Sequence, residues 1–329
     1  MTGALASDRR RMMLRTAFGA DIAAALADPL VVEVMVNPDG VLRVDRLGKG
    51  RLETGIRIDA AQVERIIRLV ASHARAEVHG DAPIVSAELP PHAEGRAGER
   101  FEGLLPPVAP GPCFAIRKPA TRVHGLADYV ADGIMAAGAA ARLRAAVRER
   151  ANILVAGGTS SGKTTLANAL LAEMASDDER VILIEDTREL QSPAADTVAL
   201  RTRPGIVGMS ELVRSTLRLR PDRIIVGEVR GPEALDMLKA WNTGHPGGIA
   251  TVHANSARSA LYRIEQLVQE AVVTVPRRLI AEAIDIIVFI SGRGLQRRVS
   301  AIARVAGIDP DTDDYSLVDL LNPADIQGA

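Results

Sequence analysis

The feature that most constrains the fold of this chain is the octapeptide G-G-T-S-S-G-K-T at residues 157–164. It matches the pattern G-x-x-x-x-G-K-[ST] at every fixed position. A short apolar run, N-I-L-V-A at residues 152–156, precedes it, and residues 165–174 after it contain helix formers with apolar residues at helical spacing. The sequence therefore predicts a strand, a loop and a helix in this order, which is the context of a phosphate-binding loop.

The residue types of this loop fit a nucleoside triphosphate. Small residues between glycines let successive backbone N–H groups turn toward phosphate oxygens, and a helix beginning near Lys163 adds the positive end of its dipole. We expect Lys163 to reach the β- and γ-phosphates, and the hydroxyl of Thr164 to bind Mg²⁺. The expected ligands are therefore ATP and Mg²⁺. The residues expected to bind the nucleotide are Gly157, Gly158, Thr159, Ser160, Ser161, Gly162, Lys163, Thr164 and Thr165.

Composition limits the other classes of function. The net charge of −1 and the aromatic content of 2% argue against stable direct binding of nucleic acid. The single cysteine, Cys113, excludes an intrachain disulfide and a four-cysteine zinc site. Residues 1–13 lack the apolar core of a secretory signal, and no apolar run approaches the length of a membrane span. We therefore expect a cytoplasmic protein that at most touches a membrane.

The 329 residues are enough for two domains. Strands expected at residues 31–36 and 41–45, joined by the turn N-P-D-G, and a helix at residues 60–74 capped by Asp59 predict a smaller α+β domain over residues 1–120. A linker is expected at residues 121–135 and a helix at residues 129–150. Further strands expected at residues 181–185, 223–227, 248–252 and 285–290 predict an α/β, RecA-like P-loop domain over residues 136–329.

Carboxylates follow two of these strands. Glu228 ends the strand at residues 223–227, where a P-loop ATPase needs an acidic residue near the metal and the attacking water. Glu185 begins the acidic stretch E-D-T-R-E at residues 185–189, and it is expected to assist catalysis or to hold Mg²⁺. An acidic turn with a capping role is the alternative for Glu189, and Asp186 has no assigned role.

A histidine follows a third strand. The segment G-H-P-G-G-I-A-T-V-H-A-N-S at residues 244–256 joins a flexible loop to a strand that ends near His253. An imidazole there can sense the γ-phosphate by donating a hydrogen bond to it or to Glu228. His253 is therefore a candidate catalytic residue.

Together these four segments resemble the secretion traffic ATPases of type II secretion, type IV secretion and type IV pili. The patterns I-I-V-G-E-V-R at residues 224–230 and the histidine segment are more specific for this family than the phosphate loop alone. The segments V-M-V-N-P-D-G, V-D-R-L-G-K-G and F-A-I-R-K-P, the last at residues 114–119, look like its conjugal-transfer branch of the TrbB type. The type II and pilus-assembly branch usually has a four-cysteine zinc module that this sequence lacks, and a pilus-retraction motor is the alternative within the family.

The resemblance implies a PAS-like N-terminal domain and a hexameric ring that passes mechanical work to inner-membrane components of a transfer apparatus. It also implies that arginines of the N-terminal domain or linker approach the γ-phosphate. Arg117 fits this role by its place in A-I-R-K-P, with Arg122, Arg203 and Arg230 as weaker candidates. From other classes, a metabolic P-loop kinase and a nonhydrolysing nucleotide-binding scaffold stay open, and the sequence does not indicate whether the cargo is DNA, protein or pilus subunits.

Overall fold

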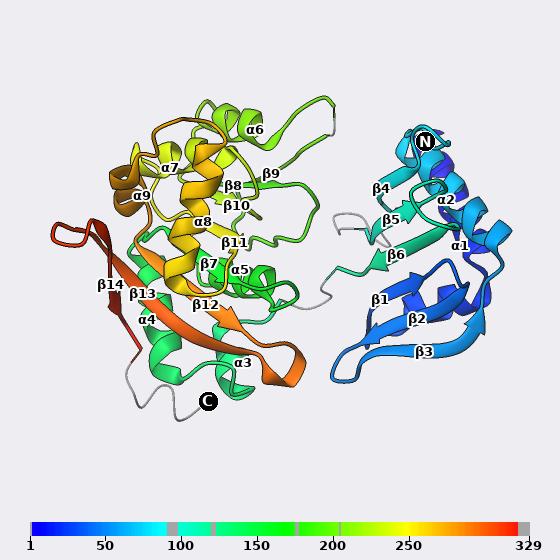
Figure 1. Ribbon diagram of the computed structural model, residues 1–329, viewed down its shortest axis with the longest axis horizontal. Helices are drawn as coiled ribbons and strands as arrows, with labels where there is room; N and C mark the ends of the chain where they lie inside the picture. The colour runs from blue at the N-terminus through cyan, green and yellow to red at the C-terminus, as the bar shows by residue number, and fades with distance from the viewer. Residues whose placement is uncertain (1, 91–97, 120–122, 175–177, 204, 322–329) are drawn as a thin grey trace. The chain divides into compact units, whose positions relative to one another are not determined.

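The chain forms two compact units in the computed structural model, Met1–Thr121 and Arg122–Ala329 (Figure 1). The structure describes residues 2–90, 98–119, 123–174, 178–203 and 205–321, without the side chains of residues 2–11 and 295. Within these residues, no helix is both long and apolar enough to cross a membrane.

The first unit is an antiparallel sheet with helices. Its sheet has the strand order β3-β2-β1-β6-β5-β4, in which all neighbouring strands are antiparallel. The elements are α1 (Thr2–Ala27), β1 (Val31–Val36), β2 (Val41–Arg46), β3 (Gly50–Arg57), α2 (Ala60–Ala74), β4 (Ile84–Glu88), β5 (Arg100–Leu104) and β6 (Cys113–Arg117).

The two helices bury apolar faces in the core of this unit. Asp59 caps α2 as expected, because its carboxylate accepts a hydrogen bond from the backbone N–H of Ala61. Ile66 and Phe18 are among the buried residues that α2 and α1 contribute to one hydrophobic cluster with the sheet. The sequence analysis did not predict α1.

The second unit contains an eight-stranded sheet in the order β14-β13-β12-β7-β11-β10-β8-β9. The six strands from β12 to β9 are parallel, and β13 and β14 extend the sheet as an antiparallel edge. Its elements are α3 (Leu126–Ala131), α4 (Ala137–Arg148), β7 (Ile153–Gly157), α5 (Lys163–Leu171), β8 (Val181–Glu185), β9 (Thr197–Arg201), α6 (Met209–Thr216), β10 (Arg223–Val226), α7 (Glu233–Asn242), β11 (Ile249–His253), α8 (Ala257–Gln269), α9 (Arg277–Ala283), β12 (Ile286–Ser291), η1 (Gly294–Gln296), β13 (Arg298–Asp309) and β14 (Asp314–Asp319).

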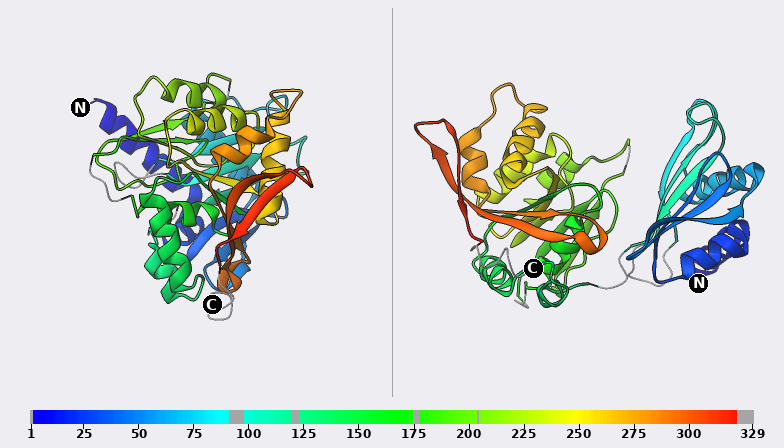
Figure 2. Two further views of the ribbon diagram at one scale, coloured as in Figure 1. Left: turned by 90° about the vertical axis from the view of Figure 1, so that its left-hand side faces the viewer. Right: turned by 60° about the horizontal axis from the view of Figure 1, so that its bottom comes forward.

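Helices cover both faces of the parallel strands (Figure 2). One core contains buried residues of α6, α7, α8 and α9, and the other contains those of α3, α4 and α5. Residues 153–157 and 181–185 are buried throughout, as expected for strands covered on two sides. This layered α/β arrangement agrees with the fold class predicted from the sequence.

The helix expected over residues 129–150 is wrong as a single element. It is divided into α3 and α4, because Gly133 adopts a left-handed conformation with φ of 67° that ends the first helix. Leu126 and Met135 belong to a core of the second unit, so much of the stretch expected as a linker at residues 121–135 is packed rather than extended.

Parallel strands place all their carboxyl ends at one edge of the sheet. The strands β7, β8, β10 and β11 follow one another along the chain in that order. In the sheet, however, β11 lies next to β7, and β10 lies between β11 and β8. Residues that follow these four strands therefore meet at this edge, which is where open α/β sheets bind ligands.

Candidate functional site

The phosphate loop joins β7 to α5 through two left-handed residues. Ser160 has a φ of 61° and Gly162 a φ of 96°, and the hydroxyl of buried Ser161 donates to the carbonyl of Gly158 over 2.9 Å. These turns shape a compact loop immediately before the N-terminus of α5. Gly158, Thr159 and Ser160 are exposed, and Thr164 and Thr165 are half-buried in the first turn of the helix. The loop therefore has the strand, loop and helix context that the sequence predicts.

Lys163 points back over this loop. Its side chain is 7% exposed, and Nζ donates to the carbonyl of Gly158 over 3.1 Å. Nζ also lies 3.3 Å from Nδ1 of His253, at the end of the adjacent strand β11. The lysine and the histidine that the sequence analysis singled out separately are therefore in contact.

Glu228 lies beside the same histidine. Its Oε1 is 2.7 Å from Nε2 of His253, although the two atoms form no hydrogen bond, and this buried oxygen has no hydrogen-bond partner among the described residues. Its Oε2 accepts a hydrogen bond from Arg230. Lys163, His253, Glu228 and Arg230 thus form a continuous chain of contacts across β7, β11 and β10.

The protonation of His253 follows from these neighbours. Partial burial lowers the pKa of His253, and the positive charge of Lys163 lowers it further, whereas Glu228 opposes the shift. A neutral imidazole has one donor and one acceptor nitrogen. His253 can therefore link a cation on one side to a carboxylate on the other.

Glu185 has a different environment from Glu228. It is 3% exposed, and its Oε1 accepts hydrogen bonds of 2.8 Å from the backbone N–H groups of Glu189 and Leu190. Burial raises the pKa of Glu185 from 4.5 to about 7, although the two N–H donors oppose this shift. This carboxylate fixes the acidic loop through Oε1, so the Mg²⁺ role expected for Glu185 would fall to its other oxygen.

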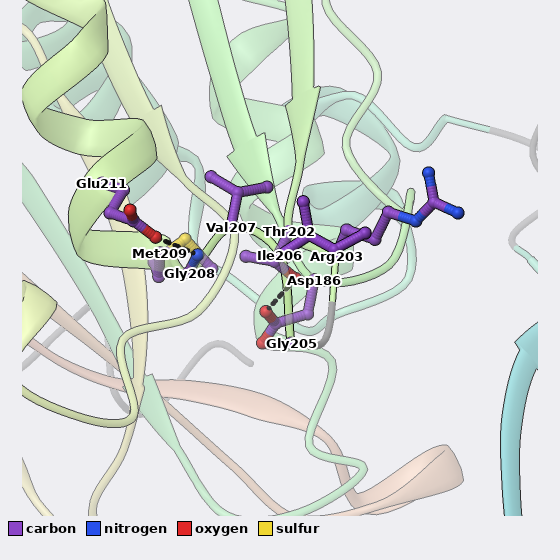
Figure 3. A pocket seen from close by; sticks show the side chains of 9 residues that line it. All are labelled: Asp186, Thr202, Arg203, Gly205, Ile206, Val207, Gly208, Met209 and Glu211. Carbon is purple, nitrogen blue, oxygen red and sulfur yellow. Dashed lines mark hydrogen bonds between the residues drawn. The ribbon is translucent and has the colours of Figure 1, made fainter.

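Asp186 separates this cluster from a neighbouring pocket. Its carboxylate accepts a hydrogen bond of 2.8 Å from the hydroxyl of Thr202, and it lies 3.9 Å from Arg230. The pocket lies at the carboxyl ends of β8 and β9 and at the start of α6 (Figure 3), and none of residues 157–165 lines it. Its lining residues are Asp186, Thr202, Arg203, Gly205, Ile206, Val207, Gly208, Met209 and Glu211.

Two arginines that the sequence analysis missed contact the phosphate loop from the side of β12, the second strand that pairs with β7. Both belong to the connection between β12 and β13. Nε of Arg293 donates to the carbonyl of Thr159 over 3.1 Å. The guanidinium of Arg297 lies against Gly162, where an added Cβ would approach Nε to 2.9 Å. No local motif marks these residues, because the β12 to β7 pairing that places them is not visible in the sequence.

Of the remaining candidate arginines, one belongs to the first unit, one lines the neighbouring pocket and one lies outside the described residues. Arg117 is an exposed residue of β6 in the first unit, and its role stays a prediction. Arg203 is exposed beside the pocket of Figure 3. Arg122 lies outside the described residues. Among the candidate arginines named from the sequence, Arg230 is the one that contacts Glu228 in the described part of the second unit.

The residues of the site fit a nucleoside triphosphate with Mg²⁺. A buried ammonium group, a helix N-terminus and left-handed loop residues suit phosphate oxygens. The buried Oε1 of Glu228 has no hydrogen-bond partner among the described residues, which leaves it as a free acceptor beside His253. Thr164 supplies a hydroxyl in the first turn of α5, which is the type of oxygen ligand that Mg²⁺ uses beside phosphates.

Comparison with known proteins gives consistent results. The chain matches the family model described as "Type II/IV secretion system protein" over residues 25–304. It is 48% identical over 296 residues to "Conjugal transfer protein TrbB" of Rhizobium radiobacter, covering 89% of this chain and 90% of the relative. It is 36% identical over 311 residues to "Type IV secretion system protein PtlH homolog" of Bordetella bronchiseptica, covering 82% and 88%.

A solved structure has the same fold. The pilus retraction motor PilT with bound ADP superposes with a TM-score of 0.62 at 17% identity, over 94% of this chain and 84% of that chain. This likeness concerns the fold, whereas the family model and the sequence relatives cover most of the chain. The chain therefore belongs to the family of type II/IV secretion system proteins.

Proposed function

We propose that this protein hydrolyses ATP with Mg²⁺ and uses the energy to drive conjugal transfer through a type IV secretion system. The observation that supports it most is the single cluster formed by Lys163, His253 and Glu228. Nζ of the lysine lies 3.3 Å from the histidine ring, and that ring lies 2.7 Å from a carboxylate oxygen of Glu228 that has no hydrogen bond among the described residues. Phosphate binding and water activation are therefore adjacent.

Each residue has a distinct chemical role in this proposal. Lys163 and the backbone N–H groups of the loop hold the phosphates, and Glu228 orients the attacking water through Oε1 and accepts its proton. Thr164 and the second carboxylate oxygen of Glu185 would hold Mg²⁺, which would supply charge neutralisation for the phosphates. His253 connects Lys163 to Glu228 and senses the terminal phosphate. Arg230 holds the other carboxylate oxygen of Glu228.

The transport role rests on the relatives. The names of the relatives at 48% and 36% identity refer to conjugal transfer and to type IV secretion. On the family resemblance we further propose a hexameric ring that contacts inner-membrane components from the cytoplasmic side. Arg117 of the first unit would then approach the γ-phosphate. A motor of a type II secretion or pilus-retraction system is the alternative assignment.

Steady-state hydrolysis by the wild type and by Glu228→Gln tests the enzymatic step. The amide keeps the shape of the side chain but cannot accept a proton, so we expect kcat to fall about a hundredfold or more. ATP affinity should stay close to that of the wild type. Lys163→Ala should instead lose ATP binding. Light scattering of each protein with and without nucleotide measures the proposed oligomer.

Glu282→Gln is the matched control. Glu282 is an exposed residue of α9, remote in sequence and strand order from the cluster, and its substitution should leave hydrolysis unchanged. Equal turnover in the wild type and in Glu228→Gln would overturn the catalytic role of Glu228. ATP binding without turnover in the wild type would favour the nonhydrolysing scaffold.

A further inference from the structure

We propose that Arg297, in the connection between β12 and β13, binds the α-phosphate of the nucleotide. This inference rests on the proposed nucleotide site and adds a residue to it that has no counterpart among the motifs of the sequence. It concerns the second unit alone. Three points support it: the direction in which the phosphate chain must run, the buried Nε of Arg297 that has no partner among the described residues, and the attachment of the same connection to the phosphate loop by Arg293.

The order of strands gives the direction of the phosphate chain. β7, which leads into the phosphate loop, pairs with β11 on one side and with β12 on the other. The groups proposed for hydrolysis, His253 and Glu228, follow β11 and β10, so the terminal phosphate belongs on that side. The nucleoside end must then extend toward β12, where the connection at residues 292–297 follows the strand.

Arg297 lies on this side at the N-terminus of α5. Its guanidinium contacts Gly162, the residue before Lys163, close enough that an added Cβ would lie 2.9 Å from Nε and 3.0 Å from Cζ. Nε is buried and has no hydrogen-bond partner in the described part of the chain. A buried arginine N–H without a partner is costly, and a phosphate oxygen is the acceptor that guanidinium groups bind best.

Tyr129 of α3 and Val299 at the start of β13 belong to one hydrophobic core. Tyr129 is 2% exposed, and its hydroxyl has no hydrogen-bond partner among the residues described. Burial raises the pKa of Tyr129, and the charge of Arg297 opposes this shift. The backbone N–H of Val299 donates to the carbonyl of Ile134 over 2.8 Å, which fixes the start of β13 against the segment after α3.

Arg293 fixes the same connection to the loop. Its Nε donates to the carbonyl of Thr159, so the chain that holds Arg297 is attached to the phosphate loop at a second point. The guanidinium of Arg297 is therefore held near the loop before any nucleotide is bound. A preformed cation of this kind strengthens binding because little side-chain freedom is lost when the ligand enters.

Affinity for ADP and ATP is the measurement that tests this inference. ADP contains the α-phosphate but no γ-phosphate, so Arg297→Ala should weaken ADP and ATP by the same factor, about tenfold or more. ATP binding is measured in the Glu228→Gln background to avoid turnover. In the wild-type background, KM for ATP should rise while kcat at saturation stays within about twofold.

Two further substitutions separate binding from packing. Arg297→Lys keeps the charge and should recover part of the affinity, whereas Arg297→Gln keeps the length without the charge and should not. Arg298→Ala, a change at the exposed neighbouring position, is the control and should bind as the wild type does. Melting temperatures without nucleotide report any loss of folding in each variant.

The outcomes distinguish this inference from the proposed function. Normal ADP affinity in Arg297→Gln, or a loss of ATP affinity with ADP affinity kept, would overturn the α-phosphate assignment. If Lys163→Ala binds ADP as tightly as the wild type, the nucleotide site itself is wrong. If the wild type binds ADP but does not hydrolyse ATP, the hydrolysis proposal fails. The Arg297 inference can still be tested in that case, because its measurement is the affinity for ADP.

Discussion

The two sides of strand β7 differ in how their charged groups are connected to one another. On the β11 side, Lys163, His253, Glu228 and Arg230 contact one another in sequence. On the β12 side, Arg297 has a buried Nε without a hydrogen-bond partner, and no ion pair of Arg297 is found in the part of the chain that the structure describes. A linked network can pass a change from one group to the next, whereas an isolated cation is ready for an anionic ligand.

This difference predicts different kinetic effects on the two sides. Changes on the β11 side should alter the rate of hydrolysis, because these groups surround the terminal phosphate and the attacking water. Changes on the β12 side should alter affinity, because that side binds the part of the nucleotide that does not react. The following substitutions test the strand ends and the two sides, from the largest expected effect to the smallest.

The largest effect expected is the pH dependence contributed by Glu185. Its pKa rises from 4.5 unfolded to about 7 folded, so the stability it contributes is fully present below pH 4.5 and is lost as the pH rises to about 7. The Glu185→Gln variant has no ionisable group at this position, so it does not lose this stability as the pH rises. Its amide oxygen can still accept hydrogen bonds from the N–H groups of Glu189 and Leu190. The variant should exceed the wild type in stability by about 1 kcal/mol or less at pH 5 and by about 3 kcal/mol at pH 8.

Urea unfolding of both proteins at pH 5 and pH 8 measures this difference. The experiment contains EDTA, so that no metal ion binds to the carboxylate during the titration. The difference between variant and wild type must change with pH, because groups other than Glu185 are common to both proteins. A constant difference at both pH values would contradict a raised pKa of Glu185.

Gly157→Ala tests the end of β7, where the β11 side and the β12 side of the strand meet. A Cβ at Gly157 would lie 2.4 Å from the carbonyl oxygen of Ile290 in β12 and 2.6 Å from the hydroxyl of Ser161 in the loop. Because the first contact is with backbone, the strand and loop must separate, at a cost of about 2 kcal/mol in unfolding free energy. Gly158→Ala is the control, since its Cβ would meet nothing within 4 Å. Equal melting temperatures for both variants would show that the contact with β12 is loose.

Sequence reasoning predicts the parts of the site that lie within one motif. The phosphate loop, the N-cap of α2 by Asp59 and the strands before Glu185, Glu228 and His253 depend on local patterns of glycine, apolar residues and caps. The contact of Lys163 with His253 was not predicted. It depends on β11 inserting beside β7, although β8 and β10 lie between them in sequence.

The parts that sequence reasoning missed depend on packing between distant segments. Alanine-rich residues 129–150 have high helix propensity throughout, but Gly133 and the burial of Met135 break the helix. The different burial of Glu185 and Glu228 cannot be predicted either, since both simply follow apolar strands. Arg293 and Arg297 could not be selected, because arginine supplies almost all the positive charge and any one of them looks ordinary.

His253→Asn tests the β11 side directly. Asparagine keeps a polar group near Lys163 but cannot reach both Lys163 and Glu228 as the imidazole does. We expect kcat to fall about tenfold while ADP affinity stays within about twofold of the wild type. This result is the reverse of that expected for Arg297→Ala. Parallel effects of the two variants on kcat and on affinity would remove the proposed difference between the sides of β7.

Thr251→Val tests how firmly β11 positions Glu228. The buried hydroxyl of Thr251 donates to the carbonyl of Gly227 over 2.7 Å, and the backbone N–H of Val229 donates to the carbonyl of Thr251 over 2.9 Å, so both neighbours of Glu228 are fixed to β11. Valine retains the shape but removes one donor. The expected cost is about 1 kcal/mol in stability and a severalfold fall in kcat, with nucleotide affinity unchanged. Thr251→Ser keeps the hydroxyl and should restore kcat. If kcat of Thr251→Ser is as low as that of Thr251→Val, the packing of the methyl group rather than the hydrogen bond positions Glu228. The network on the β11 side then begins at His253 and does not extend into the sheet.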